Sequence, residues 1–440
     1  MPDRHIPRPY VTLRHPEWTK AATLYELNTR AFTREGTLAA AEAHLPRLKD
    51  LGVDIVWLMP VHPIGTLGRK GTLGSPYAVR DYTAVNPELG TLDDLKGFVQ
   101  AAHRLGMRVI LDWVANHTAP DHPWTAEHPE WYARDWKGNL RPTPWWDWTD
   151  VADLDYAQPV LRRAMAEAMA FWVREADVDG FRCDVAGFVP VDFWETVRAE
   201  LEAIKPVFLL AEWESRDLHA RAFDATYAWS WYDAAGPIAR GEAGPDALAA
   251  YYSGNESAYP PEAMRMTFTS NHDKNAWEGT MQEHFGAGLQ AAIVLSVVGE
   301  GMPLLYSGQE AGCSRRLAFF EKDEIVWQEH PVSSLFRRLF ALKHPTPALW
   351  NAPWGARMVR IPTDAPETTL AFVRRHAAGE HAGSAVVAVF NWSAEARTVT
   401  LGNGPVAGTY TDAFSGATAD MSDSGASVEV AAWGWRVFAR

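Results

Sequence analysis

Cysteine is almost absent from this chain, whose 440 residues include only Cys183 and Cys313. Two cysteines supply neither a disulfide framework nor a cysteine metal site, and they suit a reducing compartment. Long apolar runs are also lacking, because the longest candidate, residues 287–298, is much shorter than the roughly 20 residues that span a bilayer. The first twenty residues contain no apolar stretch of signal-peptide length. We therefore expect a cytoplasmic protein that makes no membrane contact.

Positive charge is in deficit, since 41 basic and 55 acidic side chains give a formal charge of −14. A chain of this sign repels phosphate backbones, and we expect no nucleic-acid partner. Hydrophobic residues make up 47% and charged residues 22%, which is ordinary for a folded globular protein. At this length a single core is too small to use the whole chain, so the sequence predicts one large domain and a smaller one.

Strand-like and helix-like segments alternate from about residue 22 to residue 345. Apolar residues at helical spacing predict a helix over 37–51 and another over 91–105, each between two strands. Eight short apolar runs read as strands, at 23–29, 55–59, 108–113, 179–184, 207–212, 225–229, 266–271 and 303–307. Eight such units predict an α/β fold of the (β/α)8 TIM barrel type more readily than an open sheet, which usually has fewer strands.

Two segments depart from this alternation. Residues 118–152, after the third strand, show no convincing helix or strand and form a short excursion from the barrel. Beyond residue 349, short alternating runs separated by turn residues predict a C-terminal antiparallel β-domain. We therefore divide the chain into a barrel of residues 1–117 and 153–348, the excursion 118–152, and a β-sandwich of residues 349–440.

The excursion is rich in tryptophan. Aromatic faces stack on the apolar faces of sugar rings, yet a loop without secondary structure also needs large side chains for its own small core. We expect most of the tryptophans to be core, and one or two of the last three to shape a binding site. The six are Trp124, Trp131, Trp136, Trp145, Trp146 and Trp148.

Three acidic residues, Asp184, Glu212 and Asp273, each end a predicted strand. In a parallel barrel the C-terminal strand ends converge on one face, so three distant carboxylates become neighbours there. One such acid alone could equally cap the helix or turn that follows it. Three acids at corresponding positions predict a shared site at the barrel mouth.

The residues around these strand ends form motifs in a recognisable order. They run from Asp112 to His117, from Gly180 to Asp184, to Glu212, and from Asn271 to Asp273. Together they resemble the α-amylase family, glycoside hydrolase family 13. Residues 75–82, 86–91, 152–155 and 301–310 extend the likeness over the whole barrel.

The resemblance implies roles for the acidic residues and for two of their neighbours. Asp184 would be the nucleophile of a retaining glycosidase, and Glu212 the acid that protonates the leaving oxygen, with its pKa raised for that purpose. Asp273 would hold ring hydroxyls of the sugar at the cleavage point. Arg182, on the strand that carries Asp184, would keep that carboxylate ionised, and Asp112 more readily braces Arg182 than contacts sugar.

The remaining site residues are neutral or aromatic. The resemblance implies that His117 and His272 hydrogen-bond sugar hydroxyls and that a glucose ring stacks on Tyr77. Trp213, beside Glu212, could help to exclude water from it. A lone histidine is more often structural, but both histidines lie inside matched motifs.

Some positions depart from the family pattern. Gly187 and Phe188 stand where many α-amylases have a Lys-His pair that contributes to calcium binding and substrate contact. Asn116 matches a frequent calcium ligand, but the excursion offers only scattered further candidates such as Asp121, Asp135 and Asp147. We expect no metal site and no required cofactor; calcium is possible but not favoured.

These features favour a retaining hydrolase that cleaves α-1,4-linked glucans or maltooligosaccharides through a covalent glycosyl-aspartate intermediate. The residues 152–155 resemble the corresponding motif of α-amylases. An exo-acting α-glucosidase or a 4-α-glucanotransferase is the alternative, because these also lack the Lys-His pair. A protein of another class, an inactive carbohydrate-binding barrel, would be expected to have lost one of the three acids, and all are present.

Overall fold

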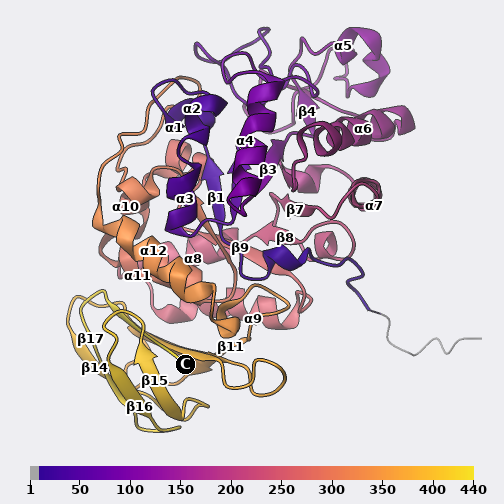
Figure 1. The fold of residues 1–440 in the computed structure, drawn as a ribbon. Coiled ribbons are helices and arrows are strands. Elements are labelled where there is room, and N and C mark those ends of the chain that lie inside the picture. The colour runs from indigo at the N-terminus through magenta and orange to yellow at the C-terminus, as the bar shows by residue number, and fades with distance from the viewer. Residues whose placement is uncertain (1–8) are drawn as a thin grey trace, which may run out of the picture.

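The computed structural model describes residues 9–440. Residues 1–8, the start of the N-terminal stretch in which we expect no signal peptide, lie outside the described residues. Figure 1 shows a barrel surrounded by helices, with the last strands forming a separate layer at one end. The helices and loops drawn at the opposite end include the excursion after the third barrel strand. Within residues 9–440 no helix is both long and apolar enough to cross a membrane.

Eight parallel strands close into a barrel in the order β1-β10-β9-β8-β7-β6-β3-β2, which confirms the predicted TIM barrel. Each of the eight predicted strands is present, with bounds that move by a few residues at most. They are β1 Leu24–Leu27, β2 Ile55–Leu58, β3 Arg108–Trp113, β6 Gly180–Cys183, β7 Phe208–Ala211, β8 Ala225–Tyr227, β9 Met264–Phe268 and β10 Met302–Tyr306.

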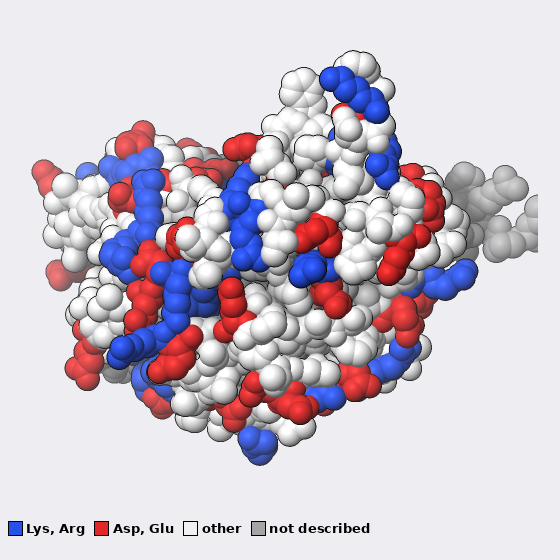
Figure 2. Space-filling model, turned by 90° about the horizontal axis from the view of Figure 1, so that it is seen from above, with Lys and Arg blue, Asp and Glu red and all other residues white. Residues whose placement is uncertain are grey.

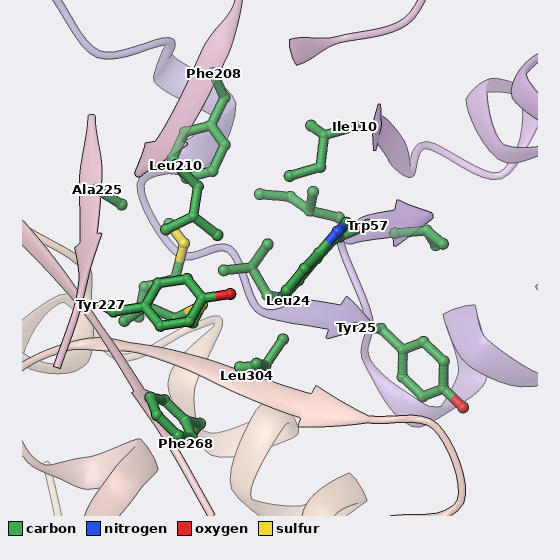
Figure 3. Close-up of a cluster of buried hydrophobic side chains, with 14 of the residues drawn as sticks. Leu24, Tyr25, Trp57, Ile110, Phe208, Leu210, Ala225, Tyr227, Phe268 and Leu304 are labelled. Atoms are coloured by element: carbon green, nitrogen blue, oxygen red, sulfur yellow. The ribbon is translucent and has the colours of Figure 1, made fainter. Parts of the chain in front are cut away.

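The barrel interior is packed with side chains rather than open. Figure 3 shows side chains from different strands meeting inside the ring, among them Leu24, Trp57 and Leu210. Strand register places Glu26 of β1 beside Trp57 of β2, and Asp112 of β3 beside Arg182 of β6. Side chains two residues apart on a strand share a face, so the apolar interior is followed by a polar layer toward the C-terminal strand ends.

The region predicted as a single helix over 37–51 is two helices, α2 Leu38–Glu42 and α3 Leu45–Leu51. Pro46 lies in the first turn of α3. A proline lacks the N–H that would bond to the carbonyl four residues earlier, and its ring collides with that carbonyl, which here belongs to the last residue of α2. The prediction of one continuous helix was therefore wrong.

The other helices cover the outside of the barrel. The predicted helix over 91–105 is α4 Leu92–Arg104, which begins with a capping box between Thr91 and Asp94. The rest are α1 Thr29–Phe32, α6 Pro159–Ala176, α7 Val191–Glu202, α8 Trp229–Ala239, α9 Ala249–Ser257, α10 Met281–Phe285, α11 Leu289–Val298 and α12 Pro331–Lys343.

The excursion is more ordered than predicted. Strand β4 (His117–Thr118) pairs antiparallel with β5 (Ala152–Asp153), so the excursion leaves and re-enters the barrel through one short ribbon, and it carries the short helix α5 (Trp124–Glu127). The prediction that most of its tryptophans are core was wrong, because only Trp131 is fully buried. Trp136 and Trp145 are 89% and 102% exposed, and Trp146 is 54% exposed.

The C-terminal region is antiparallel, as predicted. One sheet has the order β11-β12-β13-β18-β15-β16, and β14 and β17 form a separate ribbon. Apolar residues of both, including Val387 from the sheet and Val399 from the ribbon, share a buried cluster. The strands are β11 Met358–Ile361, β12 Thr369–Arg375, β13 Ala385–Asn391, β14 Arg397–Thr400, β15 Gly408–Asp412, β16 Thr418–Met421, β17 Ser427–Val430 and β18 Trp435–Ala439.

A buried arginine joins the C-terminal sheet to the barrel. Arg374 of β12 donates hydrogen bonds to the carbonyls of Gly299 at 2.6 Å, Ala356 at 2.8 Å and Trp350 at 3.0 Å. Burial lowers the pKa of Arg374 to about 10, so it remains charged near neutral pH. Its guanidinium therefore satisfies carbonyls that the interface removes from water.

Replacing Arg374 with Met should lower the thermal unfolding midpoint, because buried carbonyls lose their donors at a cost of about 2 to 4 kcal/mol. Arg375→Met is the matched control, since this neighbour on the same strand is exposed. Calorimetry of both variants would test the expectation. Equal midpoints would show that Arg374 does not hold the two layers together.

Candidate active site

The three predicted acids meet at one cavity. Asp184 follows β6, Glu212 follows β7, and Asp273 follows β9 after a short turn, and all three line a cavity of about 530 Å³. Tyr77, His117 and His272 line the same cavity, which thus gathers six of the nine predicted site residues. The other lining residues are Lys70, Ser75, Trp146, Asp147, Trp148, Asp150, Val151, Val185, Trp277, Phe319 and Phe320.

Arg182 lies beneath the cavity and links the acids. Its side chain is fully buried, and Nη1 donates to Asp112 Oδ1 at 2.8 Å and to Asp184 Oδ1 at 2.9 Å. Nη2 lies 2.9 Å from Glu212 Oε1 but is not oriented to donate a hydrogen bond to it. One planar guanidinium therefore holds the carboxylates of Asp184 and Glu212 close together. It fixes Asp184 more firmly than Glu212, because only Asp184 accepts a hydrogen bond from it.

Asp112 contacts Arg182 without reaching the cavity. It is fully buried and accepts hydrogen bonds from Trp57 Nε1 at 3.1 Å and from the Tyr77 hydroxyl at 3.0 Å. It does not line the cavity, which fits the expectation that it braces Arg182 rather than contacting a ligand.

The two acids that contact both Arg182 and the cavity, Asp184 and Glu212, disfavour simultaneous ionisation. Burial raises the pKa of Glu212, and the charge of Asp273 adds to that rise while Arg182 opposes it. Burial, and then the charge of Glu212, raises the pKa of Asp184 against the effect of Arg182. Because each carboxylate repels charge on the other, the pair retains one proton to a higher pH than isolated carboxyl groups would.

His272 lies between two carboxylates. Its Nδ1 is bonded to Glu26 Oε1, and its Nε2 lies 3.3 Å from Asp273 Oδ2. Burial opposes a charge on His272, but Asp273 and Glu26 raise its pKa well above the usual range. Burial likewise opposes the ionisation of Asp273, yet His272 lowers the pKa of that carboxyl overall. Asp273 is thus held as a carboxylate at the cavity wall.

Tyr77 closes the floor of the cavity beside His272. Its hydroxyl lies 2.7 Å from His272 Nε2, and the two rings are stacked with centroids 5.3 Å apart. His117 lines the same cavity, and burial lowers its pKa to about 4. His117 is therefore neutral at neutral pH, and its Nδ1 lies 3.1 Å from Asn116 Nδ2.

Asn116, the match to a family calcium ligand, forms hydrogen bonds within the protein. Its Nδ2 lies 3.2 Å from Thr143 Oγ1 and from Asp153 Oδ1. Asp121 accepts hydrogen bonds from Thr66, and Asp135 accepts them from the turn that follows it. Within residues 9–440 no group of three or more His, Cys, Asp or Glu side chains is placed to hold a metal ion.

Trp213 lies next to Glu212 without lining the cavity, and its ring leaves no space for a lysine side chain at position 187. A Cβ on Gly187 would come within 2.1 Å of the Trp213 ring, so the indole occupies the space that a side chain there would need. The Trp213 ring packs against Phe188 with centroids 5.1 Å apart, and Phe188 is 39% exposed. The side of the mouth near Glu212 is therefore aromatic and uncharged at these positions.

Sequence reasoning missed several residues of the site. Glu26 belongs to none of the motifs, so it was not expected in the site. A glutamate inside an apolar strand was nevertheless a signal, because a buried carboxylate needs a polar partner. Trp277 and Phe319 pack together with ring centroids 5.2 Å apart, on loops whose convergence the sequence does not reveal. Trp146 and Trp148 were not missed, because we expected one or two of the last three excursion tryptophans to shape a binding site. Both line the cavity, and their ring centroids are 5.2 Å apart. Figure 2, which views the end that carries the excursion, shows acidic and basic residues interspersed with uncharged ones over this face.

Fold and site together define a carbohydrate-active (β/α)8 barrel with paired carboxylates, and comparison with known proteins agrees. A model of the alpha-amylase catalytic domain matches residues 19–205. The crystal structure of a noncanonic maltogenic alpha-amylase, AmyB from Thermotoga neapolitana, is 32% identical, has a TM-score of 0.86, and covers 96% of this chain and 99% of its own. An alpha-amylase structure from Lactobacillus plantarum is 30% identical with a TM-score of 0.84 and the same coverage.

Among curated proteins, the alpha-amylase MalA of Haloarcula japonica is 30% identical over 426 residues. The match covers 93% of this chain but 60% of that protein, so the chain spans well under the full length of this relative. An alpha-1,4-glucan:maltose-1-phosphate maltosyltransferase of Burkholderia pseudomallei is 37% identical over 43% of this chain and 19% of its own. The chain belongs to the α-amylase family of glycoside hydrolases.

The buried charges around Arg182 predict a pH-dependent loss of stability when it is replaced. Without the guanidinium, the already raised pKa values of Asp112, Asp184 and Glu212 rise further. A carboxyl group has a pKa near ~4 in the unfolded chain. Where its pKa is higher in the folded protein, it stabilises the fold at pH values below the unfolded pKa. This stabilisation is lost as the pH rises through the folded pKa.

Arg182→Met should therefore be less stable than the wild type by about 3 to 5 kcal/mol near neutral pH, and by much less near ~pH 4. Urea unfolding at a series of pH values measures this difference. Arg163→Met, at an exposed arginine of α6, is the control and should show neither effect. A deficit independent of pH would contradict this electrostatic explanation.

Proposed function

We propose that this protein hydrolyses α-1,4-glucosidic bonds of α-glucans or maltooligosaccharides with retention, through a covalent intermediate on Asp184. The observation that carries the proposal is the contact of Asp184 and Glu212 with the two terminal nitrogens of Arg182, both at 2.9 Å. Retaining glycosidases keep their two carboxyl groups about 5 to 5.5 Å apart, whereas inverting enzymes leave room for a water molecule between them. A single guanidinium that touches both acids favours the shorter separation.

The hydrogen bonds support a different role for each acid. Asp184 accepts a charge-assisted hydrogen bond from Arg182, which favours its ionised form and directs the carboxylate as the nucleophile. Glu212 receives no such bond from Arg182 and accepts one from the Val185 N–H at 2.7 Å. We propose that the proton shared by the two acids is on Glu212. Glu212 then protonates the leaving oxygen, and its carboxylate takes a proton from the water that attacks the intermediate.

Asp273 and its neighbours bind the sugar at the cleavage point. The ionised Asp273 accepts hydrogen bonds from ring hydroxyls, and the bonds strengthen as positive charge develops on the ring. His117 binds a further hydroxyl, His272 holds Asp273 and the Tyr77 hydroxyl in position, and the ring of Tyr77 provides an apolar face. The names of the relatives, an alpha-amylase of Haloarcula japonica and a maltogenic alpha-amylase of Thermotoga neapolitana, support an α-glucan as substrate.

Transfer to a sugar hydroxyl is the second candidate, and the partial match to maltosyltransferases favours it. The same glycosyl-Asp184 intermediate would form, and a sugar in place of water would accept the glycosyl group. Products longer than the substrate in a maltoheptaose digest would identify transfer. An inactive binding protein is disfavoured because all three acids are present and placed together.

Replacing Glu212 with Gln should reduce kcat on soluble starch by about 10²- to 10⁴-fold, because the leaving oxygen is no longer protonated. Asp184→Asn should abolish the mass increment that a fluorinated glucosyl fluoride leaves on the peptide containing residue 184. Glu256→Gln, at an exposed glutamate of α9, is the control. Turnover like that of the wild type in either site variant would refute the assignment.

The raised pKa of Glu212 predicts the alkaline limb of the pH profile. A general acid is active only while protonated, so kcat/KM should fall as the pH rises through that pKa. Substrates with an activated leaving group, such as α-glucosyl fluoride, need no proton, and the limb for glycosylation should shrink with them. If the alkaline fall in kcat/KM were the same for α-glucosyl fluoride as for ordinary substrates, the fall would be due to a group other than Glu212.

We further propose that the reaction needs no calcium. Asn116 directs its amide nitrogen, rather than its oxygen, toward Thr143 and Asp153, and no clustered metal ligands occur among residues 9–440. Activity on starch should survive prolonged dialysis against excess EDTA, with an unchanged unfolding midpoint. Loss of activity that added calcium restores would overturn this expectation.

A further inference from the structure

The loops around the cavity are joined along one half of the barrel mouth. The loop after β2 reaches the excursion through Lys70, whose Nζ bonds the carbonyl of Asp147 and lies 3.6 Å from Asp150 Oδ1. The Asp150 side chain is only 6% exposed, so this contact is not a loose surface pair. Ile64 of the loop after β2 also shares a small buried cluster with Val151 of the excursion.

The same loop is joined on its other side to the loop after β10. Thr72 bonds Glu321 through both its backbone N–H, at 2.8 Å, and its hydroxyl. The Leu73 N–H donates to the Phe320 carbonyl at 3.1 Å. A Cβ on Gly71 would lie 2.6 Å from the Cβ of Phe320, which shows how closely the two loops approach.

Residues after β1 complete the connection. Arg30 Nη1 donates to the carbonyls of Gly74 at 3.1 Å and Phe319 at 3.4 Å, and thus ties the loops after β2 and β10 to a third element. Lys322 donates to the Glu35 carbonyl at 2.8 Å. We call the joined residues 64–74, 147–151 and 319–322 the loop wall. Lys70, Phe319 and Phe320 of the wall line the catalytic cavity.

Glu212 lies on the opposite side. In the ring order of the strands, β7, which ends just before Glu212, is opposite β1, and β1 lies between β2 and β10. A general acid must stand beside the leaving oxygen, so the leaving part of the substrate departs on the side of Glu212. There the mouth is bordered by Phe188 and the aromatic group around Trp213.

The part of the chain on the non-reducing side of the cleavage point therefore faces the loop wall. We propose that the wall ends the substrate cleft on this side, so that the enzyme removes short fragments of constant length from non-reducing chain ends rather than cutting internal bonds. The inference rests on the proposed function, whose substrate class it narrows. The cavity of about 530 Å³ is of a size that holds a small ligand rather than a long polymer segment.

The test uses 4-nitrophenyl α-maltoheptaoside, whose aglycone marks the reducing end, and its analogue with a 4,6-O-ethylidene group on the non-reducing glucose. The wild-type enzyme should give one dominant labelled product from the first time point. The blocked analogue should react about 10- to 200-fold more slowly, because the wall leaves no room for the added group. Labelled products of many lengths, with equal rates for both substrates, would overturn the inference and leave the proposed hydrolysis intact.

The double variant Lys70→Ala/Glu321→Ala removes the contacts on both sides of the loop after β2. The rate on the blocked substrate relative to the unblocked one should rise about two- to tenfold. This ratio is insensitive to the fraction of enzyme that folds. Lys137→Ala, at an exposed lysine of the excursion, is the control and should leave the ratio unchanged.

A double variant with the wild-type ratio would refute the role of the wall. If folded wild-type enzyme cleaves neither maltoheptaoside nor soluble starch, the proposed function itself fails, and this result differs from every outcome above.

Discussion

The fully buried guanidinium of Arg182 is the interaction on which the active site depends. Three carboxylates, those of Asp112, Asp184 and Glu212, lie around it, and none of their side chains is more than 10% exposed. Each would be costly to bury alone, and together they would repel one another. One fixed positive charge offsets that cost, and its hydrogen bonds distinguish Asp184 from Glu212. The chemistry of a retaining glycosidase needs this difference between two adjacent acids.

The site divides into a rigid part and a variable part. The acids and Arg182 stand at strand ends or on strands, where register fixes their positions relative to one another. The surroundings of the cavity come from loops, which the contacts of Lys70, Thr72 and Arg30 join into a continuous wall. Such an arrangement keeps the catalytic residues in place while the loops set which ligands can enter.

The sequence predicted the barrel well because its strands are buried on both faces and read as continuous apolar runs. It failed where an effect was local or depended on distant partners. Pro46 splits the helix predicted over 37–51, although the apolar spacing continues across the break. The excursion tryptophans were expected in a core, but three of the six are largely exposed, since a loop held by a short ribbon buries few of them.

The sequence by itself determined the family, the eight strands, and the acids at strand ends, because motif residues and strand periodicity are local properties of the chain. Only the tertiary structure decided how these acids differ. The partners of Glu212, His272 and Asp150 are residues far away in the chain. The pKa of a site residue and the shape of the cavity depend on the distances between such residues, which the sequence does not give. Glu26 shows the same limit, because its importance appears only once the closed ring places it against His272.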